Sequence, residues 1–166
     1  MQVVVKTGPL PIVVGVVVDE QGRLLLGKRK SRERQWNGQW ELLGGKIHHG
    51  ETPEEAVIRE LREEAGIEVL PTRLLGSFTS VWDLGNEKIH VLILGYSCEL
   101  MAGTPKPSSA HHELSWFSRD QLPSPRLSGT DEFVEWEFKQ PPVASAEPAS
   151  TEIGDEAATG FANMFG

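Results

Sequence analysis

Apolar residues gather in short runs that predict strands. Residues 11–18 (PIVVGVVV) and 23–29 (RLLLGKR) are rich in aliphatic and β-branched residues, and DEQG between them has turn chemistry. We therefore expect an N-terminal hairpin. Residues 72–82 (TRLLGSFTSVW) and 89–100 (IHVLILGYSCEL) predict a second pair of strands around the turn DLGNEK.

A helical pattern stands between these two pairs, over residues 53–65. Its apolar positions form one stripe of a helix: Val57, Ile58, Leu61 and Ala65. Thr52 and Glu55 have the spacing of a capping box, Pro53 fills the first helical position, and Gly66 suits a left-handed end. Residues 130–138 (TDEFVEWEF) predict a second helix. Strands and helices in this order indicate an α/β layered domain rather than a helical bundle.

Composition divides the chain into two parts. Residues 1–140 have the apolar content of one compact domain, whereas residues 141–166 are rich in Ala, Ser, Pro, Glu and Gly and contain no Lys or Arg. The second part carries four of the eight net negative charges of the chain. Such a segment buries too little apolar surface to offset its ordering entropy, so we expect a disordered acidic tail.

Charge and hydropathy exclude several classes of protein. The net charge of -8 disfavours stable binding to nucleic acids, which needs a basic face. VVGVVV is too short to span a bilayer, and the N-terminus lacks the features of a secretory signal, so we expect a cytoplasmic protein that does not enter membranes. The single cysteine, Cys98, lies in an apolar run and is expected to be a buried, unreactive thiol.

The helix over residues 53–65 also carries chemistry. Glu60, Glu63 and Glu64 fall within an arc of roughly 100° beside the apolar stripe. Three carboxylates brought together repel one another unless a cation neutralises them, and oxygen ligands of this kind suit Mg²⁺ or Mn²⁺. Taken alone, the three glutamates also fit a solvated acidic helix face.

The surrounding sequence favours the metal site. From Gly45 to Ile67 the chain reads GKIHHGETPEEAVIRELREEAGI. This segment resembles the Nudix box, whose pattern is G, five residues, E, seven residues, then R-E-U-x-E-E-x-G-U with U aliphatic. Every defining position is filled at the expected spacing, and WNGQWELLGGKIHHGET is similar to the start of the box in MutT-type enzymes. One position departs from the usual pattern, because Leu43 stands where the family has Pro before the glycine pair.

The resemblance implies a fold and an activity. The fold is an α/β/α sandwich with a mixed sheet and a loop-helix-loop catalytic box, running here from about residue 11 to residue 139. The activity is Mg²⁺-dependent hydrolysis of a pyrophosphate bond in a nucleotide, with Mn²⁺ as a substitute metal. By the same resemblance, Glu60, Glu63, Glu64 and the backbone carbonyl of Gly44 bind the metal.

Further roles follow from the resemblance. Glu60 is a candidate for the general base as well as a metal ligand, since family members differ in which glutamate takes this role. Arg59 is expected to orient the glutamates by pairing with Glu63, and Glu51 to position water or fix the loop to the helix. Glu113 is either a catalytic acid or a structural residue. MutT-type members place an acid slightly earlier, where this chain has Ala110, His111 and His112.

Substrate contacts are predicted at the end of the second strand and before the glycine pair. Lys28 and Arg29 are candidates for phosphate contacts, and Trp40 for stacking on a base. His111 or His112 could donate a hydrogen bond to a phosphate or ribose.

Three functions remain open from the sequence. The first is hydrolysis of a nucleoside triphosphate to a monophosphate and pyrophosphate, and the second is hydrolysis of ADP-ribose or another nucleoside diphosphate derivative. ADP-ribose-specific members tend to carry a Pro where this chain has residues 80–83 (SVWD). The third is a nucleotide sensor without activity, which the retained glutamates disfavour. The partner is expected to be a small nucleotide, and a homodimer stays open.

Overall fold

The structure is a computed structural model in which residues 8–139 are described. The predicted acidic tail, residues 141–166, lies outside them. Strand β1 (Leu10–Val17) runs through the middle of the fold and serves two cores at once. Val13 and Val17 pack in one core, and Ile12 and Val16 in the other, because successive side chains of a strand point to opposite faces.

The larger sheet is mixed, as the sequence predicts. Its strand order is β4-β1-β6-β5, with β4 spanning Leu43–Lys46, β5 Glu68–Asp83 and β6 Lys88–Ala102. Strands β1 and β6 run parallel, and the other two pairs are antiparallel. A second, antiparallel sheet has the order β3-β2-β7, from Trp40–Glu41, Leu24–Arg29 and His111–Phe117.

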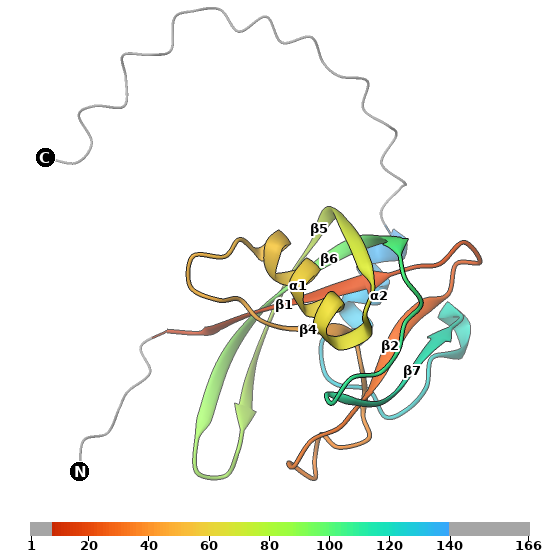
Figure 1. Ribbon diagram of the computed structural model, residues 1–166. Helices are drawn as coiled ribbons and strands as arrows, with labels where there is room; N and C mark the ends of the chain where they lie inside the picture. Colours follow the sequence, from red (N-terminus) through yellow and green to blue (C-terminus); the bar gives the residue numbers. More distant parts are fainter. Residues whose placement is uncertain (1–7, 140–166) are drawn as a thin grey trace, which may run out of the picture.

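Helices cover both faces of the larger sheet (Figure 1). Helix α1 (Pro53–Ala65) buries Val57 and Leu61 in the core that contains Val13, and helix α2 (Thr130–Lys139) buries Phe133 in the core that contains Ile12. A short 3-10 helix, η1, spans Arg119–Gln121. The predicted α/β/α sandwich is confirmed, and both helices begin at the predicted residues.

Helix α1 has the predicted ends. The Thr52 hydroxyl accepts a hydrogen bond from the backbone N–H of Glu55, whose carboxylate accepts one from the N–H of Thr52. Gly66 ends the helix with a φ of 67°, in the left-handed region that favours glycine. These local bonds set where the helix starts and stops, and therefore which way its glutamates point.

The predicted N-terminal hairpin is wrong. Strands β1 and β2 belong to different sheets and share only a bridge between Val18 and Leu24 next to the turn. The turn itself forms, because the Asp19 carboxylate accepts hydrogen bonds from the backbone N–H groups of Gln21 and Arg23. Beyond it the strands separate, since each is buried on both faces and finds its partners elsewhere in the chain.

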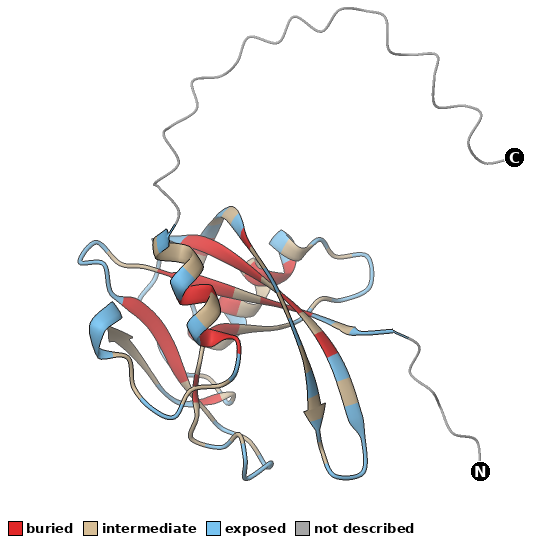
Figure 2. Ribbon diagram, turned by 180° about the vertical axis from the view of Figure 1, so that it is seen from behind, coloured by how far each residue is buried: buried red, intermediate tan, exposed pale blue. Residues whose placement is uncertain are grey.

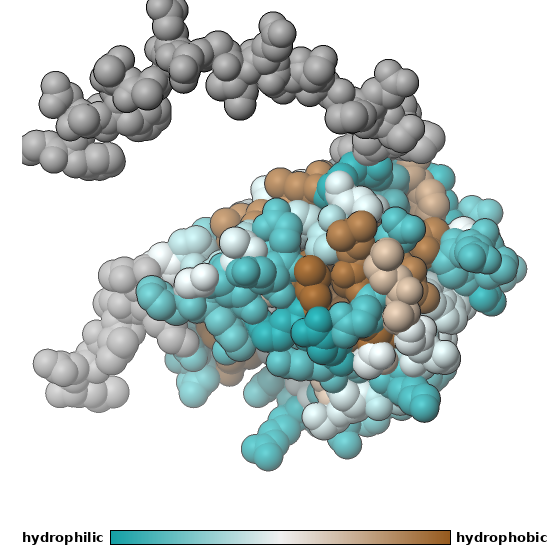
Figure 3. Space-filling model, turned by 45° about the horizontal axis from the view of Figure 1, so that its top comes forward, coloured by the Kyte–Doolittle hydropathy of each residue, from teal (hydrophilic) through white to brown (hydrophobic). Residues whose placement is uncertain are grey.

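The second predicted pair is confirmed and is longer than expected. Strands β5 and β6 form an antiparallel hairpin whose far end extends beyond the body of the molecule (Figures 1 and 2). Large hydrophobic side chains remain exposed along the length of this hairpin: Leu70, Leu74, Val81 and Met101. On the face seen in Figure 3, hydrophobic residues likewise gather in one area among hydrophilic ones. Cys98 of β6 is buried, as predicted, and burial raises the pKa of its thiol to about 12.

None of the helices between residues 8 and 139 has the length and apolar character needed to cross a bilayer.

Candidate active site

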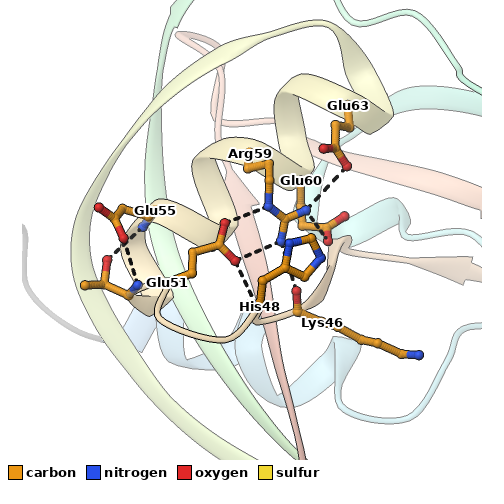
Figure 4. A network of polar contacts seen from close by, with 8 residues as sticks. Lys46, His48, Glu51, Glu55, Arg59, Glu60 and Glu63 are labelled. Carbon is orange, nitrogen blue, oxygen red and sulfur yellow. Dashed lines mark hydrogen bonds and ion pairs between the residues drawn. The ribbon is translucent and has the colours of Figure 1, made fainter.

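The guanidinium of Arg59 ties helix α1 to the loop that precedes it (Figure 4). Its Nε and Nη2 donate to the two carboxylate oxygens of Glu51, at 2.6 and 3.0 Å. Nη2 also donates to the carbonyl oxygen of Lys46 at 3.0 Å, and the N–H of His48 donates to Glu51 at 2.9 Å. The hydrogen bond from Arg59 holds the pKa of Glu51 at about 2, so this carboxyl group is ionised at neutral pH.

Arg59 also fixes Glu60. Its Nη1 lies 2.9 Å from Oε1 of Glu60 and 3.4 Å from Oε2 of Glu63. The pair with Glu63 that the sequence predicts is therefore present, but it is the longer of the two. The Glu60 carboxylate lies against Gly45, where a Cβ atom would come within 2.5 Å of Oε1. The absence of a side chain at residue 45 lets this carboxylate approach strand β4.

Glu64 lies deeper than its neighbours. Its Oε2 accepts a hydrogen bond from the backbone N–H of Gly44 at 3.0 Å. Burial, together with the negative charges of Glu41 and Glu60, raises the pKa of Glu64 to about 8, although the hydrogen bond from Gly44 acts in the opposite direction. A buried carboxyl group beside two others is poised to accept a cation in place of its proton.

One cavity of about 300 Å³ contains these carboxylates. At one end lie Glu41, Glu60 and Glu64 with the backbone of Gly44 and Gly45. The remaining wall includes the polar side chains of Lys30, Lys46, Ser128 and Thr130 but is largely apolar. Its apolar part comes mainly from the larger sheet and from helix α2 with the segment before it: Ile12, Val14, Leu42, Trp82, Ile93, Leu127, Gly129 and Phe133. The cavity therefore has a charged end and an apolar end, as a site for an amphipathic ligand requires.

The smaller sheet places the positively charged guanidinium of Arg29 at the charged end. Arg29, at the end of β2, lines the cavity and donates from Nη1 to Oε2 of Glu41 at 3.0 Å. The other oxygen of Glu41 lies 3.0 Å from Nε2 of His111 on β7. Trp36 contacts the guanidinium of Arg29, whose Cζ lies 5.4 Å from the ring centroid.

Comparison with known proteins agrees with this geometry. The model of the NUDIX domain matches residues 8–137. The chain belongs to the NUDIX domain family.

Individual relatives support this placement. A MutT-like protein from Streptomyces ambofaciens is 37% identical over 110 residues, which are 66% of this chain and 64% of that protein. An 8-oxo-dGTP diphosphatase from Proteus vulgaris is 41% identical over 66 residues, 40% of this chain and 58% of that protein. The chain thus spans less than two thirds of the length of both relatives. The crystal structure of a MutT NUDIX hydrolase from Burkholderia pseudomallei has a TM-score of 0.67 and 32% identity, covering 78% of this chain and 98% of that one.

The predicted metal ligands of this NUDIX domain are only partly brought together. Glu60, Glu64 and Gly44 line the cavity, whereas Glu63 does not, and its side chain is 60% exposed. The difference arises because residues 63 and 64 of a helix point about 100° apart. Glu63 is thus held at the rim by Arg59.

The residues of the charged end fit a divalent cation. Two carboxylates and a strand backbone supply oxygen ligands, which Mg²⁺ prefers, and an ion bound by one or two carboxylates keeps several of its waters. Within residues 8–139, no three or more His, Cys, Asp or Glu side chains are grouped as a complete metal cage. A divalent ion that is bound partly by these oxygen atoms and partly by water and substrate agrees with the small number of protein ligands.

Two predicted substrate contacts of the NUDIX domain lie elsewhere. Trp40 is 8% exposed and packs edge-on against Phe117, with ring centroids 4.9 Å apart, so its ring is part of the core rather than of the cavity wall. Lys28 lies over the Trp40 ring, its Nζ 5.9 Å from the centroid, and does not line the cavity either. Of the three predicted contacts, the structure brings only Arg29 to the cavity.

The predicted loop acid takes a different position from the one expected. Glu113 lies within strand β7 rather than in a loop, is exposed, and accepts a hydrogen bond from the Ser115 hydroxyl at 2.9 Å. It does not line the cavity, whereas Ala110 does. His111 is buried behind Glu41 and does not reach the cavity wall, and His112 bonds to Asn37.

Glu41 is a residue of the site that sequence reasoning missed. It is a charged residue in the apolar run Trp40–Leu43, and Leu42 and Leu43 separate it from the glycine pair. A lone charge in such a run indicates a buried partner, because an unpaired buried carboxylate is costly. Its partners are Arg29 and His111, and His111 is 70 positions away in sequence, so only the fold identifies it.

Proposed function

We propose that this protein hydrolyses a pyrophosphate bond in a nucleoside triphosphate, releasing a nucleoside monophosphate and pyrophosphate. The observation that carries the proposal is the cavity of about 300 Å³, which brings Glu60 and Glu64 together with a largely apolar wall. A nucleotide has the same division, with charged phosphates at one end and a flat, weakly polar base at the other. The similarity to an 8-oxo-dGTP diphosphatase supports the same class of substrate.

Mg²⁺ is the proposed cofactor, with Mn²⁺ as a substitute, held by Glu60, Glu64 and the carbonyl oxygen of Gly44. Bound there, the ion would neutralise charge on the phosphoryl oxygens and lower the pKa of a coordinated water. Glu63 at the rim is proposed to reach the same ion through water, since its carboxylate is exposed and adjoins Arg59.

The chain's own residues prepare the site for an in-line attack. Arg59 and the N–H of Gly44 fix the orientation of Glu60 and Glu64 before substrate binds. Glu60 is proposed to accept the proton of the attacking water, because it lines the cavity and its carboxylate is held in place by the ion pair with Arg59. Glu51 keeps Arg59 in place, and Arg29 is proposed to bind a phosphoryl oxygen. Glu113 does not line the cavity and takes no part in the proposed reaction.

ADP-ribose or another nucleoside diphosphate derivative is the second candidate substrate. An ADP-ribose pyrophosphatase from Methanocaldococcus jannaschii is 30% identical over 112 residues, 68% of this chain and 64% of that protein. A second hollow of about 570 Å³ shares Trp82 and Lys46 with the cavity. This hollow leaves room for a sugar attached beyond the second phosphate, where a triphosphate carries only its third phosphate.

A hydrolysis screen with Mg²⁺ tests the proposal. The substrates are normal and oxidised (deoxy)nucleoside triphosphates, ADP-ribose, dinucleotides and sugar nucleotides, with products resolved by chromatography. We expect pyrophosphate and a monophosphate from a triphosphate. Cleavage of ADP-ribose alone would replace the substrate class, and nucleotide binding without any turnover would favour a sensor.

Two glutamate variants test the assignment of the site. Glu60→Gln and Glu64→Gln preserve side-chain shape, so we expect folded proteins whose kcat falls by at least about 100-fold. Glu99→Gln, on the exposed side of β6, is the matched control and should retain full activity. Unchanged hydrolysis by both cavity variants would refute the metal and base assignments.

A further inference from the structure

Three ionisable side chains form a chain that runs from the core to the cavity. His111 on β7, Glu41 on β3 and Arg29 on β2 come from three neighbouring strands of the smaller sheet. Their side chains are 1%, 15% and 30% exposed, in that order. Both links measure 3.0 Å, from Nε2 of His111 to Oε1 of Glu41 and from Nη1 of Arg29 to Oε2. Each oxygen of the central carboxylate therefore has its own partner.

His111 occupies a space that strand β2 keeps free for it. A Cβ atom on Gly27 would come within 2.5 Å of the imidazole ring, so the ring lies directly against the glycine backbone. Because an ionised carboxylate only accepts hydrogen bonds, Nε2 of His111 is the donor to Glu41. Its buried Nδ1 has no partner among the described residues. The bond to Glu41 is thus the one polar contact recorded for this ring within residues 8–139.

Arg29 is held on two sides but keeps free donors. Glu41 takes one N–H of Nη1, and the ring of Trp36 lies beside the guanidinium. The Nε atom is buried and has no hydrogen-bond partner within residues 8–139. A guanidinium has five N–H donors, and its planar fork matches the oxygens of a phosphate. Arg29 lines the same cavity as Glu60 and Glu64, so a phosphoryl oxygen bound near these glutamates would lie close to its guanidinium.

We propose that Glu41 and His111 are positioning residues that hold the guanidinium of Arg29 ready for a substrate phosphate. Without Glu41, Arg29 is a long side chain with several accessible rotamers, and ordering it on binding reduces affinity. Without His111, the carboxylate of Glu41 loses one of its two anchors and is free to rotate. Stability alone does not account for the arrangement, because buried ionic groups are often no more stabilising than apolar ones of the same size. This inference rests on the proposed function, in which Arg29 contacts the substrate.

The test compares steady-state kinetics of full-length variants at saturating Mg²⁺, with the best triphosphate from the screen. In Glu41→Gln the side chain keeps one acceptor oxygen, whereas Arg29 and His111 each need one. We therefore expect KM to rise about tenfold, with kcat within about twofold of wild type. A merely structural defect reduces the fraction of active protein, which lowers apparent kcat and leaves KM unchanged. The division between KM and kcat thus separates positioning from misfolding.

Variants of His111 test the second link. His111→Gln places an amide donor near the original Nε2, and we expect its KM to stay within about threefold of wild type. His111→Leu removes the donor and should raise KM about as much as Glu41→Gln. The matched control is His49→Leu, at an exposed position that lines neither hollow, with wild-type kinetics expected. If His111→Leu does not fold, Glu41→Gln and His111→Gln still decide the question.

The double variant with Arg29→Met completes the experiment. If Glu41 acts through Arg29, Glu41→Gln in the Arg29→Met background should change KM by less than about twofold. The same tenfold increase in both backgrounds would overturn the inference, because Glu41 would then act on Glu64 or the metal directly. Unchanged KM in Glu41→Gln, with the wild type active, would overturn it while leaving the proposed function intact. A wild-type protein that hydrolyses no nucleotide would overturn both.

Discussion

The guanidinium of Arg59 joins three parts of the chain that are separate in sequence. It contacts the strand end at Lys46, the loop at Glu51 and the helix at Glu60. Planar, forked donors are needed to reach two oxygens of one carboxylate at the same time. The geometry of the charged end therefore depends on this residue type and not on positive charge alone.

Replacing Arg59 with Lys should destabilise the fold and impair the site together. Lysine cannot form the paired bonds to Glu51, so we expect a loss of about 2 kcal/mol in the free energy of unfolding, measured by urea denaturation. Arg62→Lys is the matched control, because Arg62 makes a similar pair with Glu68 on the exposed surface and should lose far less. Equal losses in the two variants would contradict the role given to Arg59.

Glu64 should make the metal-free protein less stable as pH rises. Its pKa is raised from an ordinary 4.5 to about 8 in the fold, so the folded state holds a proton that the unfolded state releases between these values. The free energy of unfolding should then fall from about pH 5 to about pH 8, by at most about 1.4 kcal/mol per pH unit for this group. Urea denaturation in the presence of a chelator measures it. A steep dependence that persists in Glu64→Gln would assign the effect to another group.

At the scale of elements, strand β4 lies close to strand β1 on one side and to helix α1 on the other. Its two adjacent glycines, Gly44 and Gly45, each allow one of these close approaches. Gly44 lies beside the backbone of β1, where a Cβ would come within 2.0 Å of the Val13 carbonyl oxygen. Gly45 faces the helix, where a Cβ would meet the end of the flexible Glu60 side chain. Backbone cannot move aside cheaply, whereas a side chain can.

Alanine at these two positions should separate stability from activity. Gly44→Ala is expected to reduce the free energy of unfolding by more than about 2 kcal/mol, because the clash is with the central strand. Gly45→Ala should change stability by less than about 1 kcal/mol but reduce kcat/KM at least about tenfold, since the Glu60 carboxylate must move. Denaturation and kinetics on both variants check this. Full activity in Gly45→Ala would show that the position of Glu60 is not critical.

At the scale of the whole molecule, the cavity is formed by both sheets and both helices, so occupying its charged end should stabilise the fold as a unit. A ligand that binds only the folded state at 100 times its dissociation constant adds about 2.7 kcal/mol to the free energy of unfolding. The negative charge of this protein also predicts a higher free energy of unfolding with metal, because a bound cation relieves repulsion among the cavity carboxylates.

Addition of Mg²⁺ should therefore raise Tm, and a chelator should reverse the rise. We expect a shift of several degrees for the wild type at pH 8, measured by differential scanning calorimetry. Glu60→Gln and Glu64→Gln should lose most of the shift, and Glu99→Gln should keep it. A shift of equal size in all four proteins would indicate nonspecific binding of the ion.

The sequence by itself determined the local features of this protein. The capping box of Thr52 and Glu55, the left-handed Gly66 and both helices depend on residues within a few positions of one another, so their signals survive without a fold. The same holds for the box from Gly45 to Ile67, whose spacing carries the family resemblance. Of its side chains, Glu60 and Glu64 line the cavity, and Glu51 and Arg59 form an ion pair.

Only the tertiary structure decided which distant residues meet. Strand β1 pairs with β6, about eighty positions later, rather than with its neighbour β2, because a strand buried on both faces needs partners that turn chemistry does not specify. The burial of Trp40 and the exposed position of Glu113 follow from packing in the same way. Glu41 gained its role only when the smaller sheet placed it between His111 and Arg29, since the free energy of a buried charge depends on neighbours that its own sequence does not name.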